Sequence, residues 1–148
     1  MPGCRNDFRM NTVSARIAII VNPALPLGLI ANTVAALSIG IGAAEPDLGG
    51  NLLTDGNGLT VRTSANRPVP ILQATPEALS ALLTRAQPLA SGAVLVPFPQ
   101  FARGLHRFED YLAEFPLRTL SNETIDGLGF YGPEKWVRSL TGNLKLLR

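Results

Sequence analysis

The end of the chain decides its fold, because residues 129–148 read GFYGPEKWVRSLTGNLKLLR. The apolar, β-prone run up to Tyr131 predicts a strand, and Pro133 ends it, since proline fits the first position of a helix. The residues after this proline are apolar at helical spacing, which predicts a short helix with one buried face. Gly142 is expected to cap that helix in the left-handed conformation, and the leucines that follow are expected to cover part of the core.

A second strand–helix unit lies near the start of the chain. Residues 16–21 are rich in β-branched side chains and show no alternation, which predicts a strand in the centre of a sheet. Residues 22–26 form a turn, and residues 27–42 form a helix that is apolar nearly all round. We expect such a helix to be buried between the sheet and a second surface, for example that of a partner chain.

The same region has a membrane alternative. Residues 17–44 carry no charged side chain and are long enough to span a bilayer, and their flanks resemble those of a leader peptide. Pro23 and Pro26 split this run into two pieces, and the first piece has the composition of a buried strand. We therefore favour a strand followed by a helix, with no membrane contact.

Strands and helices alternate through the rest of the chain. Strands are predicted over residues 69–73 and 93–96, the second being ended by the prolines that follow it. One helix is predicted to begin after Thr75, which would cap it, and another over residues 101–115, where aromatic and leucine residues recur at helical spacing.

Residues 52–61 predict a hairpin, because two apolar runs flank the turn sequence Asp55-Gly56-Asn57-Gly58. With the alternating strands and helices, this pattern predicts an α/β protein: a single three-layer α/β/α domain with a mixed sheet of about four core strands and a small β-hairpin arm.

Composition narrows the class of protein. A chain of 148 residues can bury a core without disulfides or metal, and residues 14–148 are predicted to form this one domain. Only 16% of residues are charged and the net charge is +2, which argues against a strongly basic nucleic-acid-binding protein, apart from a modest basic bias over residues 135–148. The single cysteine, Cys4, can form neither an internal disulfide nor a metal site.

We expect a cytoplasmic protein without metal or cofactor. Residues 1–13 are expected to form a disordered extension, and Met10 is an alternative start.

The C-terminal motif resembles a known family. Residues 131–133, Tyr-Gly-Pro, followed by residues 140–147, LTGNLKLL, are similar to the end of the archaeal and eukaryotic (type 2) peptidyl-tRNA hydrolases. Residues 16–44 resemble an uncharacterised bacterial family of domains that share this hydrolase fold. The resemblance implies the hydrolase scaffold, and it implies tRNA as a partner if the activity is kept.

The catalytic residues of that family do not carry over. Leu29 stands where the hydrolases have a lysine, and Thr33 and Ala36 fall near their glutamine and histidine. Residues 97–100, Pro-Phe-Pro-Gln, replace the family's Asp-Ala-Gly-Arg-Thr motif. Loss of the lysine would remove a group able to meet a phosphate or polarise a carbonyl. The resemblance therefore supports the scaffold, and peptidyl-tRNA hydrolysis does not follow from it.

Candidate ligand-binding residues gather at the first strand–helix junction. Asn22 ends the strand, Gly28 opens the helix and Asn32 follows one turn later, where open α/β sheets bind ligands and helix N-termini bind anions. A buried Asn32 amide without partners would cost about 1–3 kcal/mol, so either a structural bond to a neighbouring loop or a ligand contact is expected. Arg103, one turn before Arg107, is a further candidate for a phosphate contact.

Three functions remain open. The first is binding of a small polar or anionic ligand by a protein without an assigned activity. The second is a hydrolase acting on an ester of a nucleotide or tRNA, with catalytic residues that the sequence does not reveal. His106, the only histidine, is expected to be a solvated surface residue, and no nucleophile motif is present. The third is a homodimeric structural or interaction protein, indicated by the apolar helix over residues 27–42.

Overall fold

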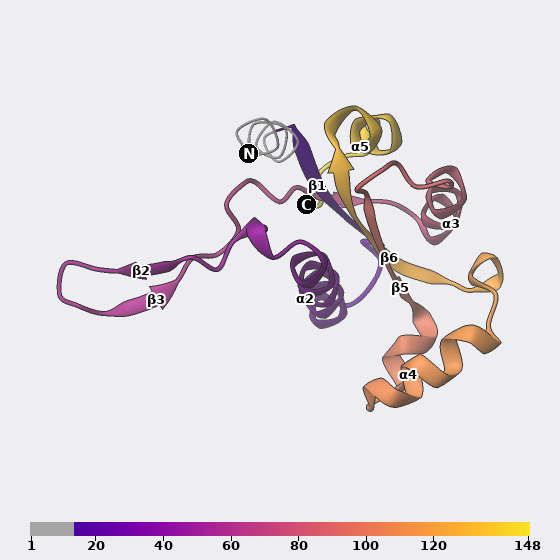
Figure 1. The fold of residues 1–148 in the computed structure, drawn as a ribbon. Coiled ribbons are helices and arrows are strands. Elements are labelled where there is room, and N and C mark those ends of the chain that lie inside the picture. Colours follow the sequence, from indigo (N-terminus) through magenta and orange to yellow (C-terminus); the bar gives the residue numbers. More distant parts are fainter. Residues whose placement is uncertain (1–13) are drawn as a thin grey trace.

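The predicted three-layer architecture is confirmed. A computed structural model describes residues 14–148, and Figure 1 shows a sheet with helices on both faces and a hairpin that projects to one side. The predictions made for residues 1–13, including those for Cys4 and Met10, lie outside the described residues.

The central sheet is mixed and has four strands in the order β4-β1-β6-β5. Its strands are β1 (Ala15–Val21), β4 (Ile71–Gln73), β5 (Val94–Pro99) and β6 (Ile125–Pro133). β1 pairs in parallel with β4 and antiparallel with β6, and β6 pairs antiparallel with β5. β1 therefore lies inside the sheet, as its unbroken apolar sequence predicts.

Helices cover both faces of this sheet (Figure 1). The helices are α2 (Leu27–Ala44), α3 (Pro76–Arg85), α4 (Phe108–Glu114) and α5 (Glu134–Thr141). On one face, Leu37 and Ile41 of α2 pack with Ile19 of β1. On the other face, α3 and α5 pack on β1 and β6 through a cluster that includes Ile20, Leu79, Leu128, Phe130, Val137 and Leu140. The Thr75 cap is confirmed, since its Oγ1 accepts the Ala78 N–H at 3.2 Å.

Glycines in β6 let α2 approach the sheet closely. A Cβ atom on Gly127 would lie 2.7 Å from Thr33 Cγ2 and 2.9 Å from the carbonyl oxygen of Ile20. A Cβ atom on Gly129 would lie 2.8 Å from Ile41 Cδ1. Real Cβ atoms do not approach other atoms so closely, so a side chain at Gly127 would have to displace the backbone of β1 as well as α2, whereas at Gly129 the flexible end of Ile41 could give way.

Two predictions about the ends of elements are wrong, one for a strand and one for a helix. β5 continues through Pro97 and Pro99 instead of ending before them. Proline is tolerated there because β5 is an edge strand, which leaves some of its N–H groups without a ladder partner. Gly142 follows α5 with φ −64° and ψ −21°, so it has right-handed geometry and is not the left-handed cap that we expected.

The single helix predicted over residues 101–115 is also wrong. A 3-10 turn spans Gln100–Gly104, and α4 begins only at Phe108. Phe108 and Leu112, which were expected to face the core, are exposed. The rings of Phe101, Tyr111 and Phe115 instead pack on one another, with 5.6 Å between the centroids of Phe101 and Tyr111. The helical spacing of these aromatic residues therefore reflects a local cluster.

α2 is long and apolar enough to cross a membrane, and it is the one such helix among residues 14–148. Its inner face packs on the sheet through Thr33, Leu37 and Ile41, so it forms part of the folded domain. Its outer face is not covered: Ile39 is 72% exposed. Within residues 14–148 the helix is thus covered on one side, and the prediction that a partner chain covers its other side is not tested by a single copy.

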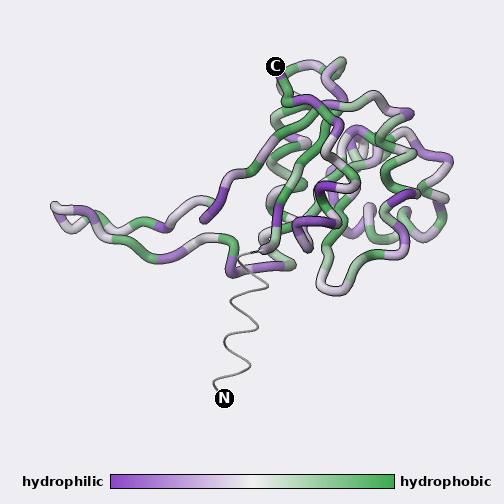
Figure 2. The backbone as a smooth tube through the Cα atoms, turned by 90° about the horizontal axis from the view of Figure 1, so that it is seen from above, coloured by the Kyte–Doolittle hydropathy of each residue, from purple (hydrophilic) through white to green (hydrophobic). Residues whose placement is uncertain are grey.

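The predicted hairpin arm is confirmed. β2 (Leu52–Thr54) pairs antiparallel with β3 (Thr60–Arg62), and Figure 2 shows the arm extending well away from the rest of the domain. At the turn, the Asp55 carboxylate accepts the N–H groups of Asn57 and Leu59, each at 2.8 Å. These hydrogen bonds lower the pKa of Asp55, with that from Leu59 contributing most.

The C-terminal tail lies along the β4 edge of the sheet, and Leu144 and Leu147 pack on the core as predicted, whereas Leu146 is exposed. Gln73 of β4 donates its N–H to the carbonyl of Lys145, and Leu147 donates its N–H to the carbonyl of Ile71. Leu147 also packs on the cluster beneath α2.

Candidate functional site

The predicted ligand residues at the first strand–helix junction are engaged in structural contacts or exposed. Asn22 Oδ1 accepts the Ala24 N–H at 3.0 Å and so closes the turn into α2. Gly28 is exposed, and a Cβ atom there would meet nothing within 4 Å. Asn32 is exposed as well, so the buried amide that we expected is not present.

Arg103 forms a bidentate ion pair with Asp126. Its Nε and Nη2 atoms lie 2.5 and 2.6 Å from the two carboxylate oxygens of Asp126, which is 1% exposed. The hydrogen bonds to Asp126 raise the pKa of Arg103. The pair ties the segment after β5 to the start of β6, which is a structural role for the arginine.

Arg103 and Asn22 both lie beside Asp126, because the Asp126 carboxylate binds Arg103 and the Asp126 carbonyl accepts the Asn22 N–H at 3.0 Å. Gly28 and Asn32 occupy exposed positions on α2. A ligand site shared by these four residues stays a prediction.

Thr33 has an unsatisfied hydroxyl. It is 1% exposed, and its Oγ1 has no hydrogen-bond partner among residues 14–148, although a buried hydroxyl in a helix commonly bonds to a carbonyl of the preceding turn. The side chain lies between α2 and Gly127, where its methyl group fills the space above the glycine. Packing against β6 explains its position without a ligand.

Two neighbouring cavities that share Arg16 and Pro70 lie elsewhere, beside the first half of β1. One has a volume of about 500 Å³ and is lined by Arg67 and Glu134, and the other, of about 350 Å³, is lined by Arg138. We call them together the arginine cleft. The cleft exists because β4 pairs with β1 only from Ile19 onward, and the chain before β4 contains prolines that cannot donate to a sheet.

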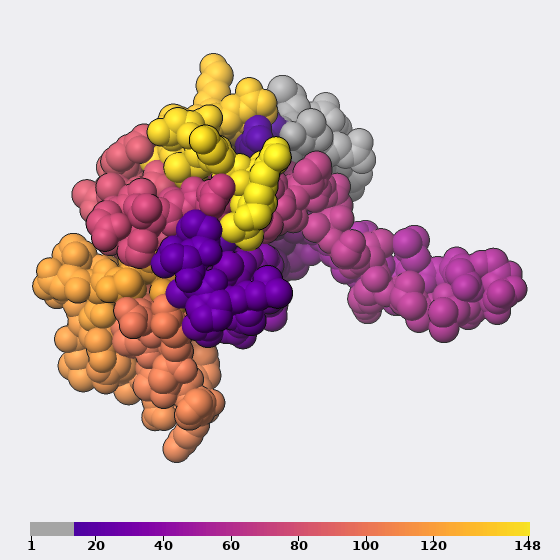
Figure 3. Space-filling model, turned by 180° about the vertical axis from the view of Figure 1, so that it is seen from behind, coloured from indigo at the N-terminus to yellow at the C-terminus, as the bar shows by residue number. Residues whose placement is uncertain are grey.

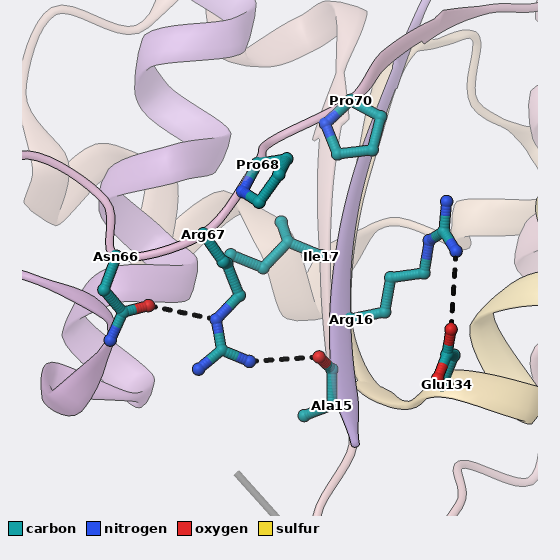
Figure 4. Close-up of a pocket in the computed structure, with 8 residues that line it drawn as sticks. All are labelled: Ala15, Arg16, Ile17, Asn66, Arg67, Pro68, Pro70 and Glu134. Carbon is teal, nitrogen blue, oxygen red and sulfur yellow. Dashed lines mark hydrogen bonds and ion pairs between the residues drawn. The ribbon is translucent and has the colours of Figure 1, made fainter. Parts of the chain in front are cut away.

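Figure 4 shows how the larger cavity is arranged around β1. On one side, Arg67 donates from Nη1 to the carbonyl of Ala15 and from Nε to Asn66 Oδ1, each at 3.0 Å. On the other side, Arg16 Nη1 lies 3.7 Å from Glu134 Oε1, which is too long for a hydrogen bond. Glu134 is closer to Arg138, at 2.7 Å. The cleft thus holds three guanidinium groups and one carboxylate.

Sequence reasoning missed these arginines. Arg16 opens a strand, Arg67 lies in a loop and Arg138 lies on a helix, and no motif or spacing connects them. The basic bias over residues 135–148 was the one sign that pointed to this end of the molecule.

Comparison with known proteins identifies the family. The model of a family described as "Protein of unknown function (DUF2000)" matches residues 15–148. The chain belongs to the DUF2000 family. A solved structure of a protein of unknown function, Atu0240 from Agrobacterium tumefaciens strain C58, is similar to this DUF2000 protein with a TM-score of 0.80. The identity is 20%, and the alignment covers 90% of this chain and 97% of that one, which shows a shared fold.

No curated protein matches this DUF2000 chain. The assignment to a family without a known function agrees with the sequence-based prediction of an uncharacterised domain. The resemblance to peptidyl-tRNA hydrolases stays a prediction.

Proposed function

We propose that this DUF2000 protein binds a small molecule with a carboxylate or phosphate group in the arginine cleft. The observation that supports this proposal is the excess of three guanidinium groups over one carboxylate around two adjoining cavities. The proposal keeps the class of ligand that the sequence predicts, and it moves the site from the start of α2 to the first half of β1.

The hydrogen bonds and ion pairs of Arg16 and Arg67 favour an anionic ligand. Arg16 is attracted to Glu134 but has no hydrogen bond to it, so its fork of donors can turn to a carboxylate or phosphate. Arg67 is held in place by Ala15 and Asn66, which lowers the entropy cost of using it as one wall of a site. Ile17 and two prolines supply an apolar floor for the rest of a small ligand.

The test uses inorganic pyrophosphate and succinate as probes in isothermal titration at low salt. We expect one of them to bind the wild-type chain, and we expect Arg16→Gln to weaken binding by about tenfold or more, because a charge-assisted hydrogen bond contributes about 1.5–3 kcal/mol. Added salt should weaken binding too, since the cleft is open to water.

Arg107→Gln is the matched control, because Arg107 is exposed and lies outside the cleft. Equal losses in both variants, or no binding of either probe at millimolar concentration, would contradict the proposal. Loss of binding in Asn32→Ala with Arg16→Gln unaffected would return the site to the start of α2.

The alternative function is hydrolysis of an ester of a nucleotide or tRNA. The resemblance of residues 140–147 to type 2 peptidyl-tRNA hydrolases supports it, as does the cationic cleft. Against it, His106 is exposed and lies outside the cleft. Incubation of the purified chain with a peptidyl-tRNA mimic at micromolar enzyme tests this function, and it is discarded if no product forms. The cytoplasmic location also stays a prediction, to be checked by cell fractionation.

A further inference from the structure

The arm displays an apolar face to solvent. Leu53 is directly paired with Val61, and alternation along β3 places Leu59 on the same face. All three side chains are more than half exposed. The opposite face is mixed: the hydroxyls of Thr54 and Thr60 share a hydrogen bond of 2.9 Å, and the exposed Leu52 is paired with Arg62. One apolar and one partly polar face are typical of a hairpin that packs one face against a surface.

The arm needs such a surface. Its two strands are three residues long, they pair only with each other, and no residue in them is buried. An isolated two-stranded hairpin is marginally stable at best in water. Figure 3 shows the arm standing clear of the domain, beyond α2 and the C-terminal tail. A second surface would supply the packing that the arm lacks.

A suitable surface lies beside the root of the arm. A cavity of about 490 Å³ is lined mainly by apolar residues of α2, β1 and the loop before β4, including Ile17, Ile19, Ile39, Ile41, Leu48 and Val69. We call this cavity and the adjoining exposed face of α2 the α2 groove. The helix that borders it carries no charged residue, and Glu45 is the one charged residue in the lining of the cavity, so covering the groove would desolvate little charge.

The arm cannot reach the α2 groove of its own chain. Residues 63–65, at the root of β3, line that groove. Backbone hydrogen bonds between Gly50 and Thr63 and between Thr63 and Asn51 hold the root in place and direct the arm outward. About five residues from the root to the tip, at about 3.3 Å each, give a reach of roughly 16 Å, which exceeds the roughly 10 Å diameter of a helix. The reach is therefore sufficient for a neighbouring copy.

The composition of both surfaces favours a protein partner over a lipid one. Residues 27–65 contain no aromatic residue, and their single cation, Arg62, donates to the carbonyl of Gly50 at 2.8 Å. Membrane-surface elements are instead rich in lysine, arginine and tryptophan. One chain carries both an apolar projection and an apolar groove at its root, so two copies related by a two-fold axis can each supply the surface that the other needs.

We propose that two copies of this chain exchange arms, so that the face formed by Leu53, Leu59 and Val61 of each copy packs in the α2 groove of the other. Each of the two equivalent contacts in this dimer covers the apolar outer face of α2 in one copy and supports the hairpin of the other copy. It is independent of ligand binding in the arginine cleft.

The test is sedimentation equilibrium of the full chain and two variants. Leu53→Glu alters the arm and Ile39→Glu alters the groove, and both positions are more than half exposed, so the monomer fold should persist. We expect a wild-type dimer and at least a tenfold rise in the dissociation constant for each variant. A mixture of the two variants should associate more tightly than either alone, because an intact arm then meets an intact groove.

Leu117→Glu is the control, since Leu117 is 80% exposed and lies outside the arm and the groove. The proposal is overturned if the wild-type chain is monomeric at about 100 µM, if either interface variant dimerises as tightly as the wild type, or if only Leu117→Glu dissociates. Binding of a monomeric wild-type chain to phosphatidylglycerol vesicles would overturn it in favour of a membrane surface.

Discussion

At the scale of single residues, the contact between α2 and β6 sets the sharpest constraints. Gly127 has no room for a methyl group, because two of the three nearest atoms to its missing Cβ lie within 3 Å and one of these two is the backbone carbonyl oxygen of Ile20. At Gly129 the nearest atom is the flexible end of Ile41, which can move. Two glycines that lie two residues apart in the same strand therefore differ in how readily they accept a side chain.

We predict that Gly127→Ala lowers the free energy of unfolding by about 1–3 kcal/mol, the usual cost of forcing an extra methyl into a packed core. Gly28→Ala is the matched control, since a Cβ there meets nothing and alanine favours a helix, so a gain of about 0.5 kcal/mol is expected. Urea unfolding of both variants provides the measurement. A Gly127→Ala variant as stable as wild type would show that both α2 and the backbone of β1 at Ile20 can move to make room for the methyl group.

Thr33 gives a second prediction at this scale. Thr33→Val removes a buried hydroxyl that has no partner and keeps the shape of the side chain, so unfolding should cost about 1 kcal/mol more than in the wild type. Thr141→Val is the control, because the Thr141 hydroxyl donates to the carbonyl of Val137 at 2.8 Å and its loss should destabilise by about 1 kcal/mol. Thermal unfolding measures whether each variant melts above the wild type, as expected for Thr33→Val, or below it, as expected for Thr141→Val. Destabilisation by Thr33→Val would mean that the hydroxyl has a partner in solution.

At the scale of elements, the ion pair between Arg103 and Asp126 holds the segment after β5 against the sheet. Arg103→Gln or Asp126→Asn should each destabilise the domain by about 3 kcal/mol, because each leaves a charged or polar group of a largely buried pair without its partner. The double variant should lose much less than the sum, since neither charge then remains. Additive losses in urea unfolding would show that the two side chains act independently.

The turn of the arm should respond to acid. Its hydrogen bonds lower the pKa of Asp55 in the folded arm, so their stabilisation is present above the unfolded pKa, near 3.9, and is lost as the pH falls through the lower folded value. The amide NMR shifts of Asn57 and Leu59 should therefore change together at acid pH, in a transition below about pH 4. Asp55→Asn keeps an acceptor oxygen and should abolish the transition. A transition that persists in this variant would assign it to another group.

At the scale of the whole molecule, the domain and the arm are separable. The arm contributes no buried residue, and its root is closed by an isolated bridge between Gly49 and Ala65. We predict that replacing residues 52–62 by Gly-Gly leaves a folded domain whose melting temperature does not depend on protein concentration. The wild-type melting temperature should rise with concentration, because dimerisation stabilises the folded state by mass action. Loss of the fold in the shortened chain would show that the arm is part of the core.

The sequence by itself determined the local elements and the layer architecture. Continuous β-branched runs, the Thr75 cap, the Asp55–Gly58 turn and the Gly-Pro junction before α5 each act within a few residues, so periodicity and turn chemistry were enough to predict them. The same local logic failed over residues 101–115, because an aromatic cluster has the spacing of a buried helix face without being one.

Only the tertiary structure decided which distant side chains meet. Arg16, Arg67 and Arg138 come from a strand, a loop and a helix, and they line one cleft because of how the sheet is ordered and where β4 begins to pair. The partner of Arg103 is likewise set by the position of Asp126 at the start of β6, 23 residues away in the sequence. Among residues 14–148, α2 is covered on its inner face alone. Pairing across a sheet joins residues far apart in sequence, and no short-range pattern records it.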